Sequence, residues 1–199
     1  MRADAIVFGI AGSLFGLIIG WVLGTQNATG TARAAAPMAQ AAPAAAGAPA
    51  AQQPPPLDQA RVQALQTVAE KDAKNVESRV QLGNLFFDSE QYPQAITWYE
   101  QAYALNPADT NVSTDLGVAY YYTNQPDRAL AQFDKSLTTD PKHVKTLLNV
   151  GIVRAFGKND LAGAAKAWEQ VVAISPDSPE GQAAKKGLEG VKNTAAAGK

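Results

Sequence analysis

Residues 82–107 read LGNLFFDSEQYPQAITWYEQAYALNP, and their arrangement of glycine, small, aromatic and proline residues returns twice further along the chain. Residues 116–141 read LGVAYYYTNQPDRALAQFDKSLTTDP, and residues 150–176 read VGIVRAFGKNDLAGAAKAWEQVVAISP. Successive glycines are 34 residues apart, and the closing prolines are 34 and then 35 residues apart. A fixed period of this length is typical of a stack of similar structural units.

The repeated positions hold residue types that suit closely packed helices. Each copy has an aliphatic-glycine pair, an alanine 12 or 13 residues after that glycine, and an aromatic residue four positions after the alanine. Small residues let neighbouring helices approach, and large ones fill the spaces between them. In these positions the chain resembles the tetratricopeptide repeat, a helix-turn-helix unit of 34 residues. The matching residues are Leu82-Gly83, Leu116-Gly117 and Val150-Gly151, then Ala95, Ala129 and Ala164, then Tyr99, Phe133 and Trp168.

The third copy departs from the family's pattern. Arg154 stands where the first two copies have the aromatic residues Phe86 and Tyr120. The third copy is also one residue longer, and we expect the extra residue in its turn, near residues 158–160. The tryptophan that the pattern places early in the first helix is missing from all three copies.

The resemblance implies that the first helices of the repeats line a concave groove, which usually binds a peptide or a helix of another protein. Phe87 and Tyr121 hold equivalent places in adjacent repeats, so they are either anchors for a partner or fillers between repeats. One subclass of the family clamps a C-terminal carboxylate with lysines and an arginine. Val80 stands where the first of those lysines belongs, so we do not expect that specificity. Helical spacing selects Asn84, Phe87, Asp88, Val118, Tyr121, Tyr122, Lys145, Leu148, Ile152 and Phe156 as groove residues.

The segments that flank the repeats are predicted to form the ends of the stack. Residues 57–75 read as an unpaired helix, with Leu57, Ala64, Leu65, Val68 and Ala69 on one apolar stripe. Residues 178–192 begin with Ser178 as an N-cap and Pro179 at the first helical position, and they predict a solvating cap helix. We expect the tail, residues 193–199, to be frayed.

Residues 5–23, AIVFGIAGSLFGLIIGWVL, contain no charged side chain. As a helix they would be about 28 Å long, close to the ~30 Å hydrocarbon core of a bilayer. A secretion signal has a shorter apolar core with its cleavage site close behind, whereas the nearest good Ala-x-Ala site here is residues 32–34. The favoured interpretation is an uncleaved anchor, and a cleaved signal is the alternative. Arg2 precedes the apolar run, so the positive-inside tendency places the N-terminus in the cytoplasm and the repeats outside it, in a bacterial periplasm.

Four glycines recur at every fourth position of this apolar segment. Residues four apart share one face of a helix, and small residues let helices approach closely in a membrane. This register predicts packing against another transmembrane helix or a second copy of the chain, although glycine is also tolerated in a membrane helix that stands alone. The four positions are Gly12, Gly16, Gly20 and Gly24.

Residues 25–56 are rich in alanine and proline and carry one charge, so they predict a tether without a core. The resulting prediction is an all-α chain with a transmembrane anchor (1–24), this linker (25–56), a leading helix (57–75), three repeats (76–109, 110–143 and 144–177), a cap (178–192) and a tail.

The composition argues against a catalytic or metal site and against a nucleic-acid partner. The 199 residues carry a formal net charge of −1, whereas nucleic-acid binding usually needs a basic face. There is no cysteine, and the single histidine, His143, is expected to be an exposed connector residue. We therefore expect no catalytic residue, no metal and no cofactor.

The favoured function is a membrane-tethered scaffold that holds a protein or peptide client in its groove during the assembly or maturation of another protein. Anchor, tether and short array in this order resemble bacterial membrane-bound tetratricopeptide proteins, some of which serve cytochrome c maturation. The alternative is a structural accessory subunit of a larger membrane complex.

Overall fold

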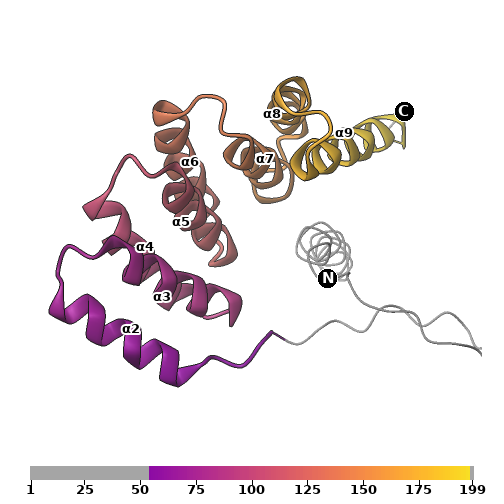
Figure 1. Ribbon diagram of the computed structural model, residues 1–199. Coiled ribbons are helices and arrows are strands. Elements are labelled where there is room, and N and C mark those ends of the chain that lie inside the picture. Colours follow the sequence, from indigo (N-terminus) through magenta and orange to yellow (C-terminus); the bar gives the residue numbers. More distant parts are fainter. Residues whose placement is uncertain (1–53, 198–199) are drawn as a thin grey trace, which may run out of the picture. The chain divides into compact units, whose positions relative to one another are not determined.

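The computed structural model describes residues 54–197, and within this range it contains eight α-helices and no strand (Figure 1). The predicted anchor and nearly all of the linker fall in residues 1–53, outside the described residues. In the described range no helix is long and apolar enough to cross a membrane. The helices are α2 (Gln59–Lys71), α3 (Val76–Asp88), α4 (Tyr92–Leu105), α5 (Thr110–Tyr122), α6 (Pro126–Thr139), α7 (Val144–Ile152), α8 (Leu161–Ile174) and α9 (Pro179–Ala197).

Three helix pairs follow one another and make the three repeats. α3 packs on α4, α5 on α6 and α7 on α8, and α4 and α6 also contact the first helix of the next repeat. The leading helix α2 packs on α3, and α9 packs on α8 and α7. The helices succeed each other along the stack in chain order (Figure 1). The predicted all-helical stack of repeats is confirmed.

Each repeat is closed by an aromatic ring that lies against the bare backbone of its glycine. A Cβ atom built on Gly83 would collide with the ring of Tyr99, one on Gly117 with Phe133, and one on Gly151 with Trp168. The three rings are almost completely buried. Glycine therefore lets the two helices of a repeat approach until a large ring fills the space between them, as the spacing predicted.

The turn inside each repeat has the same form. Glu90, Asn124 and Asn159 adopt φ angles of 58°, 60° and 54°, in the left-handed region. The second helix begins two residues later in every repeat. In α4 and α6 a proline occupies the first turn of the helix, where its missing N–H leaves no bond unmade.

The extra residue of the third repeat lies in the first helix, and the prediction that it lies in the turn is wrong. α7 continues into a π-helical turn, η1 (Val153–Gly157), in which the amide of Lys158 donates to the carbonyl of Val153 at 3.1 Å. Because the left-handed residue and the helix start after it fix the length of the turn, the inserted residue widens one helical turn instead.

Both flanking helices differ in detail from their predictions. In α2, Val62 and Ala69 are the buried residues, whereas Ala64 and Val68 of the predicted stripe are exposed. α9 begins as predicted, with the Ser178 hydroxyl accepting from the amide of Gly181 at 3.0 Å. It then continues to Ala197, through most of the tail that was expected to fray.

The second and third repeats meet at a buried cluster of hydroxyl groups. Thr114 Oγ1 lies 2.6 Å from Thr146 Oγ1, which lies 2.9 Å from Ser136 Oγ. His143 Nδ1 lies 2.7 Å from Thr146 Oγ1. The histidine is therefore a half-buried member of this junction, and its expected exposure is wrong because α7 begins directly on α5 and α6.

Candidate partner-binding surface

Four aromatic rings form a cluster where α3 and α5 end and α4 begins. Tyr92 stacks on Tyr122 with ring centroids 4.6 Å apart, and Phe87 meets Tyr92 and Tyr122 edge-on at 5.2 Å and 5.6 Å. Tyr121 lies 6.2 Å from Tyr122. All four side chains are half-buried. This aromatic cluster (Phe87, Tyr92, Tyr121 and Tyr122) therefore offers rigid ring surface beside the solvent.

The first helices are direct neighbours, so their exposed side chains share one surface, the first-helix face of α3, α5 and α7. Phe87 of α3 contacts Tyr122 of α5, and Lys145 of α7 forms an ion pair of 2.7 Å with Asp115 of α5. The ion pair is partly exposed, with 45% and 25% of the two side chains accessible. The two contacts join all three repeats across this face.

Several predicted polar residues lie on this face. Asn84 is exposed, and its Oδ1 accepts from the Tyr99 hydroxyl at 2.7 Å. Asp88, at the end of α3, is also exposed. Partial desolvation, followed by repulsion from Asp115, raises the pKa of Asp88. A carboxylate in this position is less well hydrated than one on an open surface.

The apolar residues that were predicted to line the groove differ in how deeply they are buried. Leu148 and Ile152 are only 8% and 5% exposed, so they offer little surface to a partner. Val118 is half-buried and packs against the core. Phe156, in η1, is 40% exposed. Phe156 stands three residues before the left-handed Asn159, as Phe87 and Tyr121 stand before Glu90 and Asn124, and the extra residue of the repeat precedes Phe156.

Sequence reasoning missed Tyr92 and Asp115. Asp115 shares helical spacing with Val118 and Tyr122, so the pattern that selected those two residues could also have found it. Tyr92 belongs to a second helix and reaches the cluster across the turn, and helical spacing within α3 or α5 gives no signal for it. Burial, followed by the nearby charge of Glu90, raises the pKa of Tyr92 to about 12.

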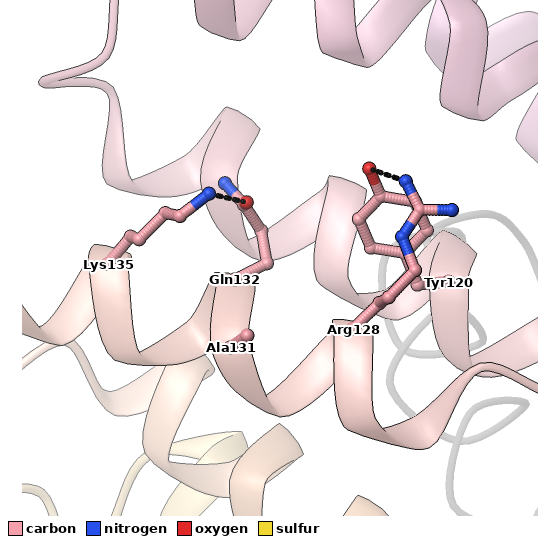
Figure 2. Close-up of a pocket in the computed structure, with 5 residues that line it drawn as sticks. All are labelled: Tyr120, Arg128, Ala131, Gln132 and Lys135. Atoms are coloured by element: carbon pink, nitrogen blue, oxygen red, sulfur yellow. Dashed lines mark hydrogen bonds between the residues drawn. The ribbon is translucent and has the colours of Figure 1, made fainter.

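The other surface of the second repeat carries a small open hollow of about 190 Å³. Figure 2 shows Arg128, Ala131, Gln132 and Lys135 of α6 lining it with Tyr120 of α5. Arg128 lies 4.0 Å from the Tyr120 ring centroid and pairs with Glu100 at 3.3 Å. Burial and the hydrogen bond to Glu100 raise the pKa of Tyr120 to about 12. Because its polar groups already satisfy one another, this hollow is a weaker candidate than the first-helix face.

Two models of known protein families match the repeats. One family model, described as TPR repeat, matches residues 83–124, and another, described as tetratricopeptide repeat, matches residues 114–179. Residues 83–179 are tetratricopeptide repeats. The resemblance inferred from the glycine and aromatic spacing is thereby confirmed for this part of the chain.

A curated protein and a solved TPR domain from the same fungus each resemble part of the chain. The heat-shock protein cognate co-chaperone sgt12 of Aspergillus fumigatus is 30% identical over 110 residues, which are 55% of this chain and 32% of that protein. The crystal structure of the Sgt2 TPR domain from Aspergillus fumigatus has a TM-score of 0.56 at 27% identity, over 61% of this chain and 79% of that one.

A structure with a bound peptide shares the fold. The first TPR domain of Spaghetti (RPAP3), bound to the HSP90 peptide SRMEEVD, has a TM-score of 0.57 at 22% identity, over 63% of this chain and 96% of that one. The chain spans 11% to 58% of the length of the curated relatives that it matches.

Proposed function

We propose that this tetratricopeptide chain is an adaptor that binds a peptide or helix of another protein on its first-helix face. The observation that carries the proposal is the aromatic cluster. In this cluster the helices α3, α4 and α5 hold Phe87, Tyr92 and Tyr122 in mutual contact beside solvent. Rings fixed in this way lose little conformational freedom when a partner covers them, and such residues dominate many protein interfaces. The peptide bound to the RPAP3 domain supports this use of the fold.

We further propose that residues 5–23 tether the adaptor to a membrane, with the repeats on the extracytoplasmic side. The length and composition of that segment support the tether, and Arg2 before it supports the orientation. In this setting the adaptor would hold a client during assembly or maturation of another protein, with a cytochrome c maturation-like role as one candidate. Protease added to intact spheroplasts should then degrade the repeats. Repeats that stay protected until the cells are lysed would contradict the orientation.

The binding surface is tested by removing two of its rings. Phe87→Ala with Tyr122→Ala should abolish co-purification of the client with the full-length chain in mild detergent. Because both rings are half-buried, the free energy of unfolding should fall by less than the 3–5 kcal/mol typical of a fully buried aromatic residue. Tyr103→Ala is the matched control, because it removes a half-buried ring from α4 beside Lys135 of α6.

Client capture that survives the double substitution, or that Tyr103→Ala abolishes equally, would exclude this surface. The same preparation separates the alternative role. A client that dissociates in salt and is present in less than equal amount fits an adaptor. A stoichiometric, salt-resistant complex fits a structural subunit that packs on its partners through the helix face carrying Gly12, Gly16, Gly20 and Gly24.

A further inference from the structure

Carboxylates flank the aromatic cluster. Asp88 follows Phe87 at the end of α3, and Glu90 stands in the turn between Phe87 and Tyr92. The charge of Glu90 reaches both Tyr92 and Tyr122, and the charges of Asp88 and Asp115 reach Tyr99 beneath the same face. A partner that covers these rings therefore approaches two exposed carboxylates, Asp88 and Glu90.

Two lysines of the third repeat, Lys145 and Lys158, already pair with carboxylates of the second repeat, Asp115 and Asp127. Lys145 Nζ lies 2.7 Å from Asp115 Oδ1. Among the described residues, neither Asp88 nor Glu90 forms an ion pair with a lysine or arginine. An acidic ligand would have to compete with Asp115 for Lys145 and would be repelled by the other two carboxylates.

A cation on the partner would instead gain from both kinds of group. It would offset the partial desolvation of Asp88 and its repulsion from Asp115, which together raise the pKa of Asp88. It would also lie beside aromatic rings, whose faces attract lysine and arginine. An aliphatic or aromatic neighbour of that cation could cover the exposed ring surface at the same time.

We propose that the aromatic cluster, Asp88 and Glu90 accept a segment of a partner protein that carries lysine or arginine next to an aliphatic or aromatic residue. This inference rests on the proposed function and specifies its ligand. The proposed segment has a net positive charge, whereas the peptide SRMEEVD that is bound to the RPAP3 domain carries one arginine and three acidic residues.

A peptide library displayed on phage tests the proposal against the full-length chain in mild detergent. Enriched peptides should have a net positive charge, with lysine or arginine beside an apolar residue, and they should fail to bind the Phe87→Ala with Tyr122→Ala variant. Synthetic copies should bind about fivefold more weakly to Asp88→Asn or to Glu90→Gln, the loss expected for one partly exposed ion pair. Glu77→Gln is the matched control, because Glu77 lies at the opposite end of α3 and accepts from Gln81. It should leave affinity unchanged.

The outcomes separate the two proposals. Enrichment of acidic peptides that still require Phe87 and Tyr122, or binding of SRMEEVD to the wild type as tight as that of any enriched peptide, would overturn the charge preference and leave the binding surface standing. Peptides that bind the double variant as well as the wild type, or no enrichment at all, would overturn the proposed function itself. Circular dichroism of each variant confirms that the repeats remain helical.

Discussion

In each repeat an aromatic ring packs so closely against a glycine that a larger residue would collide with it. Replacing such a glycine therefore affects the free energy of unfolding differently from replacing a glycine on the surface. Gly117 faces the fully buried ring of Phe133, whereas a Cβ on Gly190 of α9 would meet nothing within 4 Å. In an exposed helix, alanine in place of glycine is favourable by up to about 1 kcal/mol. The same substitution can therefore have opposite signs at the two positions.

Gly117→Ala should lower the free energy of unfolding by about 1–2 kcal/mol, because overpacking against Phe133 exceeds the gain in helix propensity. Gly190→Ala should raise it by up to about 1 kcal/mol. Urea unfolding followed by circular dichroism measures both. Equal effects of the two substitutions would show that the ring moves aside and that the close approach is not required.

Asp160, the N-cap of α8, should make the stability of the fold depend on pH. Its carboxylate accepts from the Gly163 amide at 2.8 Å and from Arg154 at 2.7 Å, and these bonds lower its pKa from the ordinary 3.8. The stabilisation is complete above the ordinary pKa and is lost as pH falls through the lower folded-state pKa.

Comparison with Asp160→Asn isolates this effect, because asparagine still caps the helix but does not titrate. Thermal unfolding of the two proteins between pH 7 and pH 2 should show the wild type losing its advantage below about pH 4. A constant difference across that range would mean that the carboxylate charge contributes nothing.

At the scale of elements, the π-helical turn is the feature that sets the third repeat apart. It places Phe156 at the distance from the turn that Phe87 and Tyr121 have in the other repeats, although the repeat is one residue longer. π-helical turns are uncommon and often occur at functional sites. An aromatic residue thus stands three residues before the left-handed residue in all three repeats.

Deletion of Arg154 should restore an uninterrupted α-helix and leave the repeats folded. Gly151 would then precede the left-handed residue by the same interval as Gly83 and Gly117 do, and the exposed ion pair that is lost contributes little. Deletion of Val118 from α5, which has no extra residue to give up, should rotate half of that helix by about 100° and unfold the repeat. Far-UV circular dichroism distinguishes the two, and equal damage from both deletions would show that the π-helical turn is required for folding.

At the scale of the whole described array, stability depends on each unit covering the next. The last repeat is covered by α9, in which Ala183 and Ala184 are buried and Gly187 lies against Trp168. The residues at 192–194 are exposed. The cap is therefore packed in its first half and solvated near its end.

A chain that stops after Pro176 should aggregate and unfold at a much lower temperature, because it exposes the ring of Trp168 that α9 covers. A chain that stops after Lys192 should keep nearly the unfolding temperature of the complete chain. Differential scanning calorimetry with light scattering measures both. A similar unfolding temperature for the shorter chain would show that the third repeat needs no cover.

The sequence alone determined the number and order of the repeat helices. These depend on contacts at fixed short spacing, such as Gly83 with Tyr99, on prolines at helix starts, and on caps such as Asp160 and Ser178. The aromatic residues Phe87 and Tyr121 could also be selected for the first-helix face by spacing. Localisation and the membrane anchor stay predictions, because they depend on residues 1–53.

Only the tertiary structure decided what surrounds each side chain of the binding surface. It stacked Tyr92 of α4 on Tyr122 of α5, paired Asp115 with Lys145 of the next repeat, and buried Leu148 and Ile152. It also placed the extra residue in a helix rather than in a turn. The physical reason is that helical spacing fixes the direction of a side chain about its own axis, whereas the neighbouring helices decide whether that direction leads to solvent, a charge or another ring.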